Sequence, residues 1–148
     1  MRLIPFEVLH AEELIAGELS DERNRPSFGV RAIENLIVPE MSFSGIHYGH
    51  LVFSGGIAPL WEGVGEAWIL GADRVPQHTV AVARICKRYI YRIAKEQKLH
   101  RVQAHMKSDW PELSRWASFL GMQHEGTVRQ MTTKKENYEL YSVVSDGS

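Results

Sequence analysis

The stretch from Gly65 to the helix that begins near His78 carries residue types that could bind an anion. Gly65–Gly71 has the apolar content of a buried strand, a short polar turn continues to Gln77, and a long amphipathic helix follows. A helix that starts directly after a strand aims unpaired backbone N–H groups and the positive end of its dipole at whatever lies beside that strand. The arrangement predicts a site for a pyrophosphate or another anion.

Composition indicates a single globular domain. The chain has 148 residues, of which 44% are apolar, and this is enough to bury one core. We expect one domain over residues 1–144 and a disordered tail at 145–148. The one cysteine, Cys86, falls in a helical pattern and is expected to be a small buried thiol. No window approaches the roughly 20 apolar residues of a membrane span, so we expect a soluble, cytoplasmic protein that does not enter a membrane.

Basic residues gather in one segment of the chain. Residues 84–101 contain seven lysines and arginines and a single acidic residue, Glu96. Such a cationic face could contact nucleic acid, a phosphorylated cofactor or an acidic protein surface. It could equally be the solvated outer face of an amphipathic helix, which long basic side chains commonly cover.

Hydrophobic periodicity predicts how the elements that carry these residues follow one another. A strand is expected at 3–9, and helices are expected at 11–19 and 27–37. Alternation then predicts strands at 46–53, 57–61 and 66–70, with turns at Ser54–Gly56 and Glu62–Gly65. A helix at 79–97 and a strand at 102–106 complete a strand, helix, strand unit whose crossover is long enough for parallel pairing.

The last part of the chain predicts a short helix and a terminal hairpin. Asp109 and Glu112 have the spacing of a capping box, and Gly121 is placed to end the helix that they open. Segments 123–131 and 138–144 alternate as the hairpin. His47 and His50 lie three residues apart on one predicted strand, so they should face opposite sides, and we expect no metal site.

Two runs of residues carry a resemblance to a known family. Ser114–Met122, followed by Glu125 and Gly126, resembles a late helix ending in Leu-Gly-Phe, with an acidic-glycine pair shortly after, in the GNAT superfamily of acyl-CoA-dependent N-acyltransferases. The order of elements matches that superfamily over essentially the whole chain. Trp68–Asp73, with His78 and Trp116, is similar to a group of phage-encoded GNAT-like proteins that includes the internal virion protein of some short-tailed phages.

The resemblance implies an α/β (α+β) fold with a mixed, mostly antiparallel central sheet, a parallel strand pair at the cofactor cleft and about four helices. In that fold the strand at 66–71 splays from the strand at 101–106, and the pantetheine arm of acetyl-CoA inserts between them. Acetyl-CoA would be the co-substrate, and an unidentified amine would be the acceptor. The residues that the resemblance places on acetyl-CoA are Ile69, Leu70, Gly71 and Ala72 at the thioester, and Gln77, His78, Thr79, Val80, Ala81 and Arg84 at the pyrophosphate.

Glu66 is the catalytic residue that the resemblance implies. One branch of the family, the histone-acetyltransferase type, has its general base at this place, and a gapless alignment from Glu66 to Val82 keeps the spacing. A carboxylate at a strand start beside a cleft can have its proton affinity raised by partial burial, which suits base catalysis. The alternative is a solvated glutamate at a turn.

Three residues depart from the family's pattern. Its phosphate loop has small residues where this sequence has Val80 and Val82, and β-branched side chains there would crowd the phosphates. Its usual acid, a tyrosine four positions before the late-helix glycine, is replaced by Ala117. Direct protonation of the departing thiolate by that route is therefore lost.

Two functions of different classes remain open. One is an acyl-CoA-dependent N-acyltransferase that transfers an acetyl group to an amine of a small molecule or protein. The other is a catalytically decayed phage GNAT-fold protein, located in the host cytoplasm or the virion, that acts as a virion component or binds a host protein through the basic helix at 84–101. A homodimer is compatible with both. Nucleic-acid binding is a third alternative, but no recognition motif accompanies the basic residues.

Overall fold

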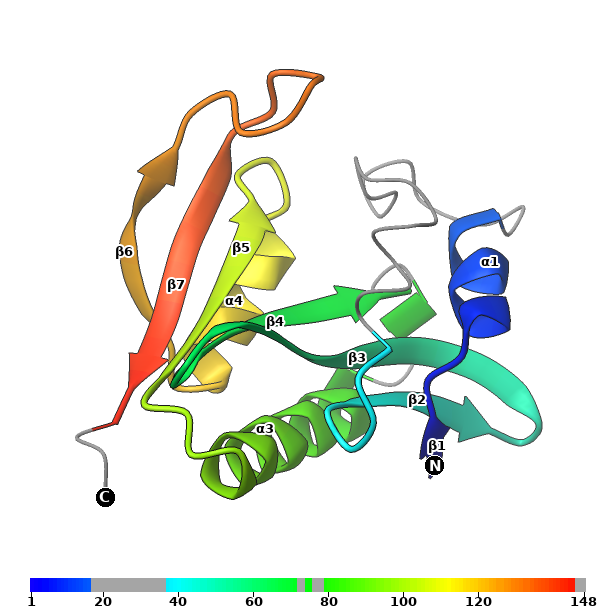
Figure 1. Cartoon of the computed structure of the whole chain (residues 1–148). Coiled ribbons are helices and arrows are strands. Elements are labelled where there is room, and N and C mark those ends of the chain that lie inside the picture. The colour runs from blue at the N-terminus through cyan, green and yellow to red at the C-terminus, as the bar shows by residue number, and fades with distance from the viewer. Residues whose placement is uncertain (17–36, 72–73, 76–78, 146–148) are drawn as a thin grey trace.

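The computed structural model describes residues 1–16, 37–71, 74–75 and 79–145. In this part of the chain seven strands form one sheet and three helices pack on it (Figure 1). In order across the sheet the strands are β1 (Arg2–Pro5), β2 (Ser42–His47), β3 (His50–Trp61), β4 (Val64–Leu70), β5 (Arg101–Lys107), β7 (Tyr138–Val144) and β6 (Gln123–Val128). The helices are α1 (Val8–Ala16), α3 (Thr79–Glu96) and α4 (Pro111–Phe119).

The sheet confirms the predicted fold class. All neighbouring strands are antiparallel except β4 and β5, which are parallel and are connected through α3. The strand predicted at 3–9 is shorter than expected, because α1 already begins at Val8. The helix predicted at 27–37 lies outside the described residues except for its last position, and the tail predicted at 145–148 does so except for its first.

The two faces of the sheet bury separate apolar clusters, because side chains of a strand alternate between its faces. The larger cluster lies under α3 and α4 and includes Phe53, Ile57, Val102 and Ala104. The smaller cluster joins α1 to the end of β4 and consists of Phe6, Ala11, Leu14 and Leu70, with Trp68 packed against it. The sheet is therefore covered on both faces near β4, which is where the chemistry predicted from the sequence would lie.

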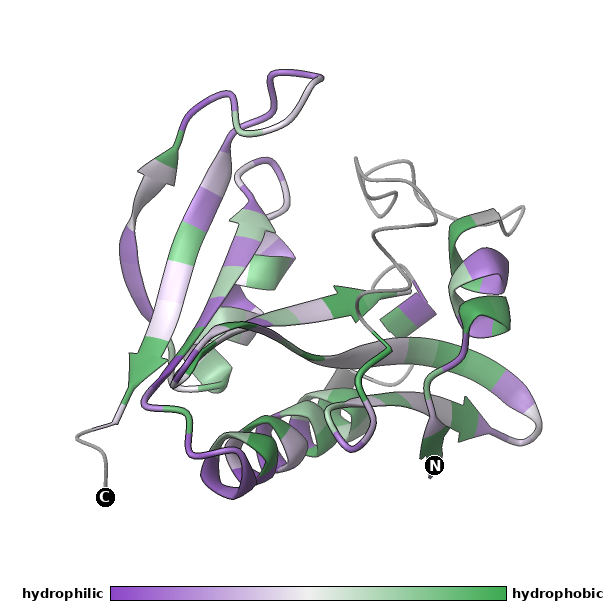
Figure 2. Cartoon of the chain, in the orientation of Figure 1, coloured by the Kyte–Doolittle hydropathy of each residue, from purple (hydrophilic) through white to green (hydrophobic). Residues whose placement is uncertain are grey.

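Helix α3 is amphipathic, as its sequence predicts. Val82, Cys86, Ile90 and Ile93 recur every three or four residues and are buried against the sheet. Figure 2 shows hydrophobic and hydrophilic residues alternating along this helix. Burial raises the pKa of the Cys86 thiol to about 12, so this cysteine is an inert core residue, as expected. In the described residues no helix combines the length and the apolar character needed to cross a membrane.

The hairpin between β2 and β3 turns at a different place from the one predicted. Tyr48 and Gly49 form its two-residue loop, both with positive φ (49° and 78°). The residues Ser54–Gly56, expected to be a turn, lie in the middle of β3. Asparagine and glycine are the usual signal for a loop in which both residues have positive φ, and tyrosine is not part of that signal, so this turn is only weakly indicated by its residues.

Gly56 is required by close packing and not by a turn, and Gly55 beside it has more room. A Cβ atom at Gly56 would lie 2.3 Å from the Met41 carbonyl oxygen and 2.8 Å from Ser42 Cα, both of them backbone atoms. A Cβ atom at Gly55 would come no nearer than 3.3 Å to the Trp68 carbonyl oxygen. Glycine inside a strand often marks such an approach between backbones.

The capping box predicted at Asp109 is absent, whereas the end of the same helix is as expected. Helix α4 starts one residue later, with Trp110 at the N-cap and Pro111 in its first turn, and no side-chain cap hydrogen bond forms there among the described residues. Proline is favoured at this position because its missing N–H would have no helical partner. Gly121 follows the C-cap with φ of 82°, which confirms its predicted role.

Replacing Gly56 by alanine should destabilise the fold by roughly 2–3 kcal/mol, because the new methyl group overlaps backbone atoms that side-chain rotation cannot move. Gly55→Ala is the matched control on the same strand, and its cost should be clearly smaller. Urea denaturation followed by circular dichroism measures both changes. Equal free energies of unfolding for the two variants would contradict this account of Gly56.

Candidate active site

The parallel strands β4 and β5 are paired over a short distance only. Among the described residues their ladder consists of three pairs: Val64 with Arg101, Gly65 with Val102, and Glu66 with Gln103. Beyond Glu66, β4 remains paired with β3 and β5 remains paired with β7. The two strands therefore diverge from Glu66 onwards, as Figure 1 shows.

This divergence leaves an edge of β4 that faces away from β3 without a sheet partner. Over residues 67–70 no ladder to another described strand forms on that side. Backbone N–H and C=O groups of such an edge are strong hydrogen-bonding groups, and an extended ligand can pair with them as an additional strand would. The backbone thus has the splayed arrangement that the resemblance implied.

Glu66 lies on the last pair of the ladder, where the strands separate. Its Oε1 accepts a hydrogen bond from Gln103 Nε2 at 3.0 Å, and its Oε2 lies 2.7 Å from His105 Nδ1. The side chains of His105 and Glu66 are 21% and 23% exposed. Glu66 is therefore a partly buried residue inside β4 and not a solvated residue at a turn.

Strand alternation brings these three polar side chains together. On β5, Val102 and Ala104 point into the core beneath α3 and α4, so Gln103 and His105 point to the opposite face. Because Glu66 is paired with Gln103, it points to that face too. The polar side chains of β5 therefore lie where β4 begins to diverge from β5.

A chain of hydrogen bonds fixes the orientation of Gln103. Arg101 Nε donates to Gln103 Oε1 at 3.0 Å, which leaves the Gln103 amide nitrogen to donate to Glu66. Arg101 in turn donates two hydrogen bonds to Glu125 of β6, at 2.8 and 2.9 Å. Ser142 Oγ of β7 donates to the same carboxylate. Such a supporting network holds a reactive group in one geometry.

The charges of this network shift two pKa values. The hydrogen bond to Glu66 raises the pKa of His105, the negative charge of Glu66 adds to the effect, and partial burial opposes it. The hydrogen bonds from Arg101 and Ser142 lower the pKa of Glu125 from 4.5 to about 2. His105 thus holds a proton more tightly than an isolated imidazole, while Glu125 remains ionised down to strongly acidic pH.

The thioester residues named by the resemblance lie along the diverging part of β4. The Ile69 side chain packs against the core beneath α3, and Leu70 is buried in the cluster with α1. Gly71 follows the strand with φ of 84°, and a Cβ atom there would lie 2.7 Å from the Leu14 side chain and 2.9 Å from the Val52 carbonyl oxygen. Only the backbone of these residues is therefore placed to contact a ligand in the gap. Ala72 lies outside the described residues.

The residues named for the pyrophosphate gather at the start of α3 as far as they are described. Thr79 is the first residue of the helix, and Val80, Ala81 and Arg84 are exposed. Gln77 and His78 lie outside the described residues. Val82, expected to crowd the phosphates, is fully buried in the core, so its side chain does not lie beside the helix start. Val80 is 64% exposed and is the one of the two valines that could crowd a ligand there.

Ala117, which stands where the family's pattern has a tyrosine, is a core residue. Ala117 is fully buried in the cluster beneath α3 and α4. Tyr141 belongs to the same cluster, which makes it a packing residue. The basic side chains Arg84, Lys87 and Arg88 of α3 are exposed, and Lys87 lies 5.0 Å from the centre of the exposed Phe119 ring.

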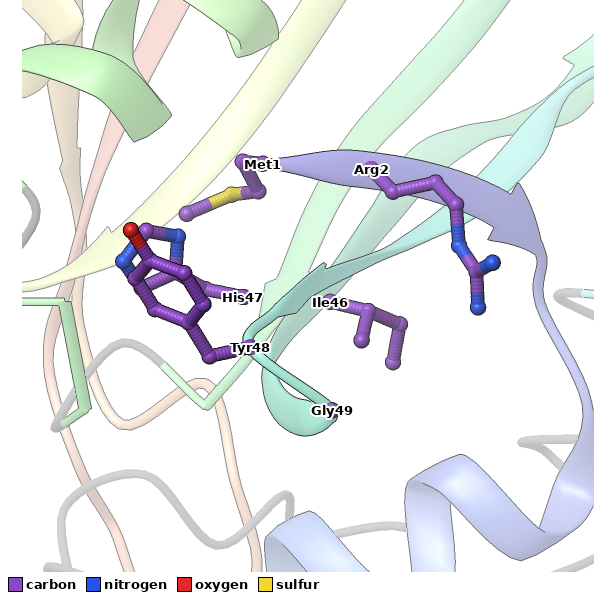
Figure 3. A pocket seen from close by; sticks show the side chains of 6 residues that line it. All are labelled: Met1, Arg2, Ile46, His47, Tyr48 and Gly49. Carbon is purple, nitrogen blue, oxygen red and sulfur yellow. The ribbon is translucent and has the colours of Figure 1, made fainter.

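The turn at Tyr48 and Gly49 corrects the prediction for His47 and His50. They are paired across the hairpin and so point to the same face, contrary to what one continuous strand would give. A pocket of about 530 Å³ lies here, lined by Met1, Arg2, Ile46, His47, Tyr48 and Gly49 (Figure 3). Among the described residues no group of three or more metal-ligating side chains forms, at this hairpin or elsewhere.

Gln103 and His105 are the site residues that sequence reasoning missed. Their alternation with Val102 and Ala104 signals a polar face of a strand. What the sequence does not show is the register between β4 and β5, and this register is what puts Glu66 against both residues.

Comparison with known proteins identifies the fold. No family model and no curated protein sequence matches the chain. It is similar to the ribosomal-protein-alanine N-acetyltransferase from Brucella melitensis, with a TM-score of 0.74 at 12% identity over 97% of this chain and 99% of that one. Ard1 from Thermoplasma volcanium has a TM-score of 0.77 at 13% identity over 97% of both chains. An acetyltransferase of the GNAT family from Bacillus anthracis has a TM-score of 0.70 at 17% identity over 96% and 93%. The chain therefore has the GNAT fold over nearly its whole length.

Replacing Glu125 by glutamine should make the stability of the protein less dependent on pH in the acid range. Because the folded-state pKa of Glu125 is lowered to about 2, its carboxylate stabilises the fold fully above the ordinary value of 4.5, and this contribution is lost as the pH falls from there through about 2. The difference in free energy of unfolding between wild type and Glu125→Gln should therefore be constant at neutral pH and shrink as the pH falls.

Urea denaturation at a series of pH values measures this difference. Glu112→Gln, at an exposed position of α4, is the control and should show a much smaller effect. A difference for Glu125→Gln that stays constant down to strongly acidic pH would contradict the pairing of Glu125 with Arg101.

Proposed function

We propose that the protein is an acyl-CoA-dependent N-acyltransferase that transfers an acetyl group from acetyl-CoA to an amine of a small molecule or protein. The observation that carries this proposal is the divergence of β4 from β5 with the Glu66 and His105 pair where it begins. The similarity of the fold to solved N-acetyltransferases and the local geometry of the described residues both support this proposal.

The backbone supports binding of acetyl-CoA in the gap. The free edge of β4 over residues 67–70 can pair with the amide groups of the pantetheine arm, which is an extended chain. The N–H groups at the start of α3 and the positive end of its dipole favour the pyrophosphate, and the exposed Arg84 adds a positive charge one turn further on. Backbone N–H groups of Ile69 to Ala72 would polarise the thioester carbonyl.

The acceptor amine has to lose a proton before it can attack. An amine is protonated at neutral pH, and only its lone pair can form the new bond to the carbonyl carbon. In the proposed reaction the Glu66 and His105 pair removes that proton, the amine nitrogen bonds to the acetyl carbon, and the bond from that carbon to sulfur breaks. The nitrogen, which is positively charged once it is bonded to that carbon, gives up its second proton, the leaving thiolate takes up one proton, and the products are the amide and free CoA. Ala117 contributes no hydroxyl to this last proton transfer.

A second candidate is a GNAT-fold protein without catalysis that binds another protein through the outer face of α3. Two observations favour it: Val80 is exposed at the helix start, where it would crowd a phosphate, and Lys87 and Arg88 form part of an exposed cationic face. This candidate predicts no binding of acetyl-CoA, so a titration separates the two functions.

Isothermal titration with acetyl-CoA should show binding in the micromolar range, and Val80→Gly should tighten it several-fold because the β-branched side chain no longer crowds the phosphates. Val82→Ala is the matched control two residues further along the helix. It should lower stability, since Val82 is fully buried, and leave the affinity unchanged. No detectable heat at millimolar acetyl-CoA would leave only the second candidate.

Glu66→Gln should keep the affinity for acetyl-CoA and lower turnover with the amine by roughly 10²–10⁴-fold, the typical contribution of general acid–base catalysis. Steady-state kinetics with a panel of amines measures the turnover, and titration measures the affinity. Glu62→Gln, at an exposed position in the turn before β4, is the control and should behave as wild type. Unchanged turnover in Glu66→Gln would remove Glu66 from the mechanism.

A further inference from the structure

We propose that His105 Nε2 is the atom that receives the proton from the acceptor amine, and that Glu66 acts through His105 as a positioning residue. This inference rests on the proposed acyltransferase function and assigns the roles within its proton-accepting pair. Three features of the described residues carry it: the occupation of the Glu66 oxygens, the tautomer of His105 and the surroundings of its ring.

Both oxygens of Glu66 are already engaged by fixed donors. Gln103 donates to Oε1 at 3.0 Å, and its amide cannot flip without losing the hydrogen bond from Arg101 to its own oxygen. Oε2 lies 2.7 Å from His105 Nδ1, a short distance that is typical of a charge-assisted hydrogen bond. A carboxylate held in this way is oriented by the protein, and each of its two oxygens already faces a donor.

The same contact determines the tautomer of His105. An ionised carboxylate is only an acceptor, so the hydrogen between Glu66 Oε2 and His105 must be carried by Nδ1. The lone pair of the neutral imidazole is then on Nε2, for which the described residues show no hydrogen-bond partner. A histidine whose one nitrogen donates to a carboxylate, and whose other nitrogen is a free acceptor, is the base of the familiar acid, histidine and nucleophile arrangements.

The groups around His105 favour the protonated form of its ring. Glu66 faces it from β4, and the hydrogen bond between them raises the pKa of His105. On the same face of β5, Arg101 is paired with Glu125 and Lys107 with Glu136, so the positive charges nearest in sequence are both compensated. From β7 the residue paired with His105 is Leu140, flanked by Tyr138 and Ser142. Helix α4 packs on the opposite face.

A base works best when its pKa lies near the working pH, since it must be unprotonated before the step and basic enough to take the proton. An ordinary carboxylate has a pKa of about 4.3 and an ordinary imidazole about 6.5, and Glu66 moves His105 further upwards. In the proposed step one N–H bond of the ammonium breaks and a bond from hydrogen to Nε2 forms. The imidazolium that results stays beside the negative charge of Glu66, while the neutral amine keeps the electron pair that attacks the carbonyl carbon.

Nuclear magnetic resonance of the full chain without substrates tests the pair independently of activity. Histidine ¹⁵N shifts should show Nδ1 protonated and Nε2 as the titrating nitrogen, with a pKa for His105 that falls in Glu66→Gln. His50, exposed at the β2–β3 hairpin, is the control and should titrate identically in both proteins. A neutral ring that carries its hydrogen on Nε2 and not on Nδ1, or an unchanged His105 titration in Glu66→Gln, would overturn the proposal.

The pH dependence of kcat/KM assigns the base. Activity should rise as pH passes through the His105 pKa, because only the neutral ring accepts a proton. Glu66→Gln should keep this rise and move it to lower pH, whereas His105→Gln should lose it and lower kcat/KM by roughly 10²–10⁴-fold. His50→Gln should behave as wild type. If instead Glu66→Gln loses the rise and His105→Gln keeps it, Glu66 itself is the base.

Different results would contradict the acyltransferase function and the role of His105. If the wild-type protein binds no acetyl-CoA and acetylates no amine in a broad panel, the acyltransferase function is wrong and His105 has no proton to receive. If wild type is active and His105→Gln, folded as shown by circular dichroism, keeps wild-type kcat/KM and pH dependence, the function stands and the role of His105 is wrong.

Discussion

The structure depends on one constraint, which is that β4 and β5 are parallel neighbours yet share only three residue pairs. Parallel strands need a crossover, here provided by α3, which begins soon after the end of β4 and returns the chain to the start of β5. Each strand is held on its other side by an antiparallel partner, β3 for β4 and β7 for β5. Because strands twist, two strands anchored in this way to different neighbours can separate without either losing its own ladder. The opening is therefore a property of the backbone and does not need a special side chain to hold it.

The polar residues lie where β4 and β5 begin to diverge because of the same strand pairing. A strand whose one face packs under two helices must present its other residues to the opposite face, and on β5 those residues are Arg101, Gln103 and His105. A strand of an all-parallel sheet usually buries apolar side chains on both faces. This face of β5 is instead only partly buried, and its polar side chains satisfy one another through Glu125 at the outer end.

Local patterns in the sequence were enough to predict the amphipathic helix α3, the strand β7 and the end of α4 at Gly121, while the sheet class followed from the family resemblance. They failed where the decisive interaction is between distant segments. Gly55 and Gly56 were interpreted as a turn because glycine is common in turns, yet Gly56 is a glycine so that Met41 and Ser42 can approach β3. The same limit applies to the site. Glu66 was found through the family resemblance, while Gln103 and His105 were not, because the register of two parallel strands is set by the whole sheet and not by either strand.

Val80 and Val82 both stand where the family's pattern has small residues, but the two side chains have different physical effects. Positions 80 and 82 are two residues apart, so on a helix they point in directions that differ by more than a quarter of a turn. Val82 is fully buried against the sheet, where a branched apolar side chain fills core volume that a glycine would leave empty. Val80 is exposed at the helix start, where its side chain does no packing comparable to that of Val82 and only limits access to the N–H groups. Val82 therefore concerns the stability of the domain, whereas Val80 concerns its ligand. Only Val80 bears on whether the anion site predicted from the sequence can bind a ligand.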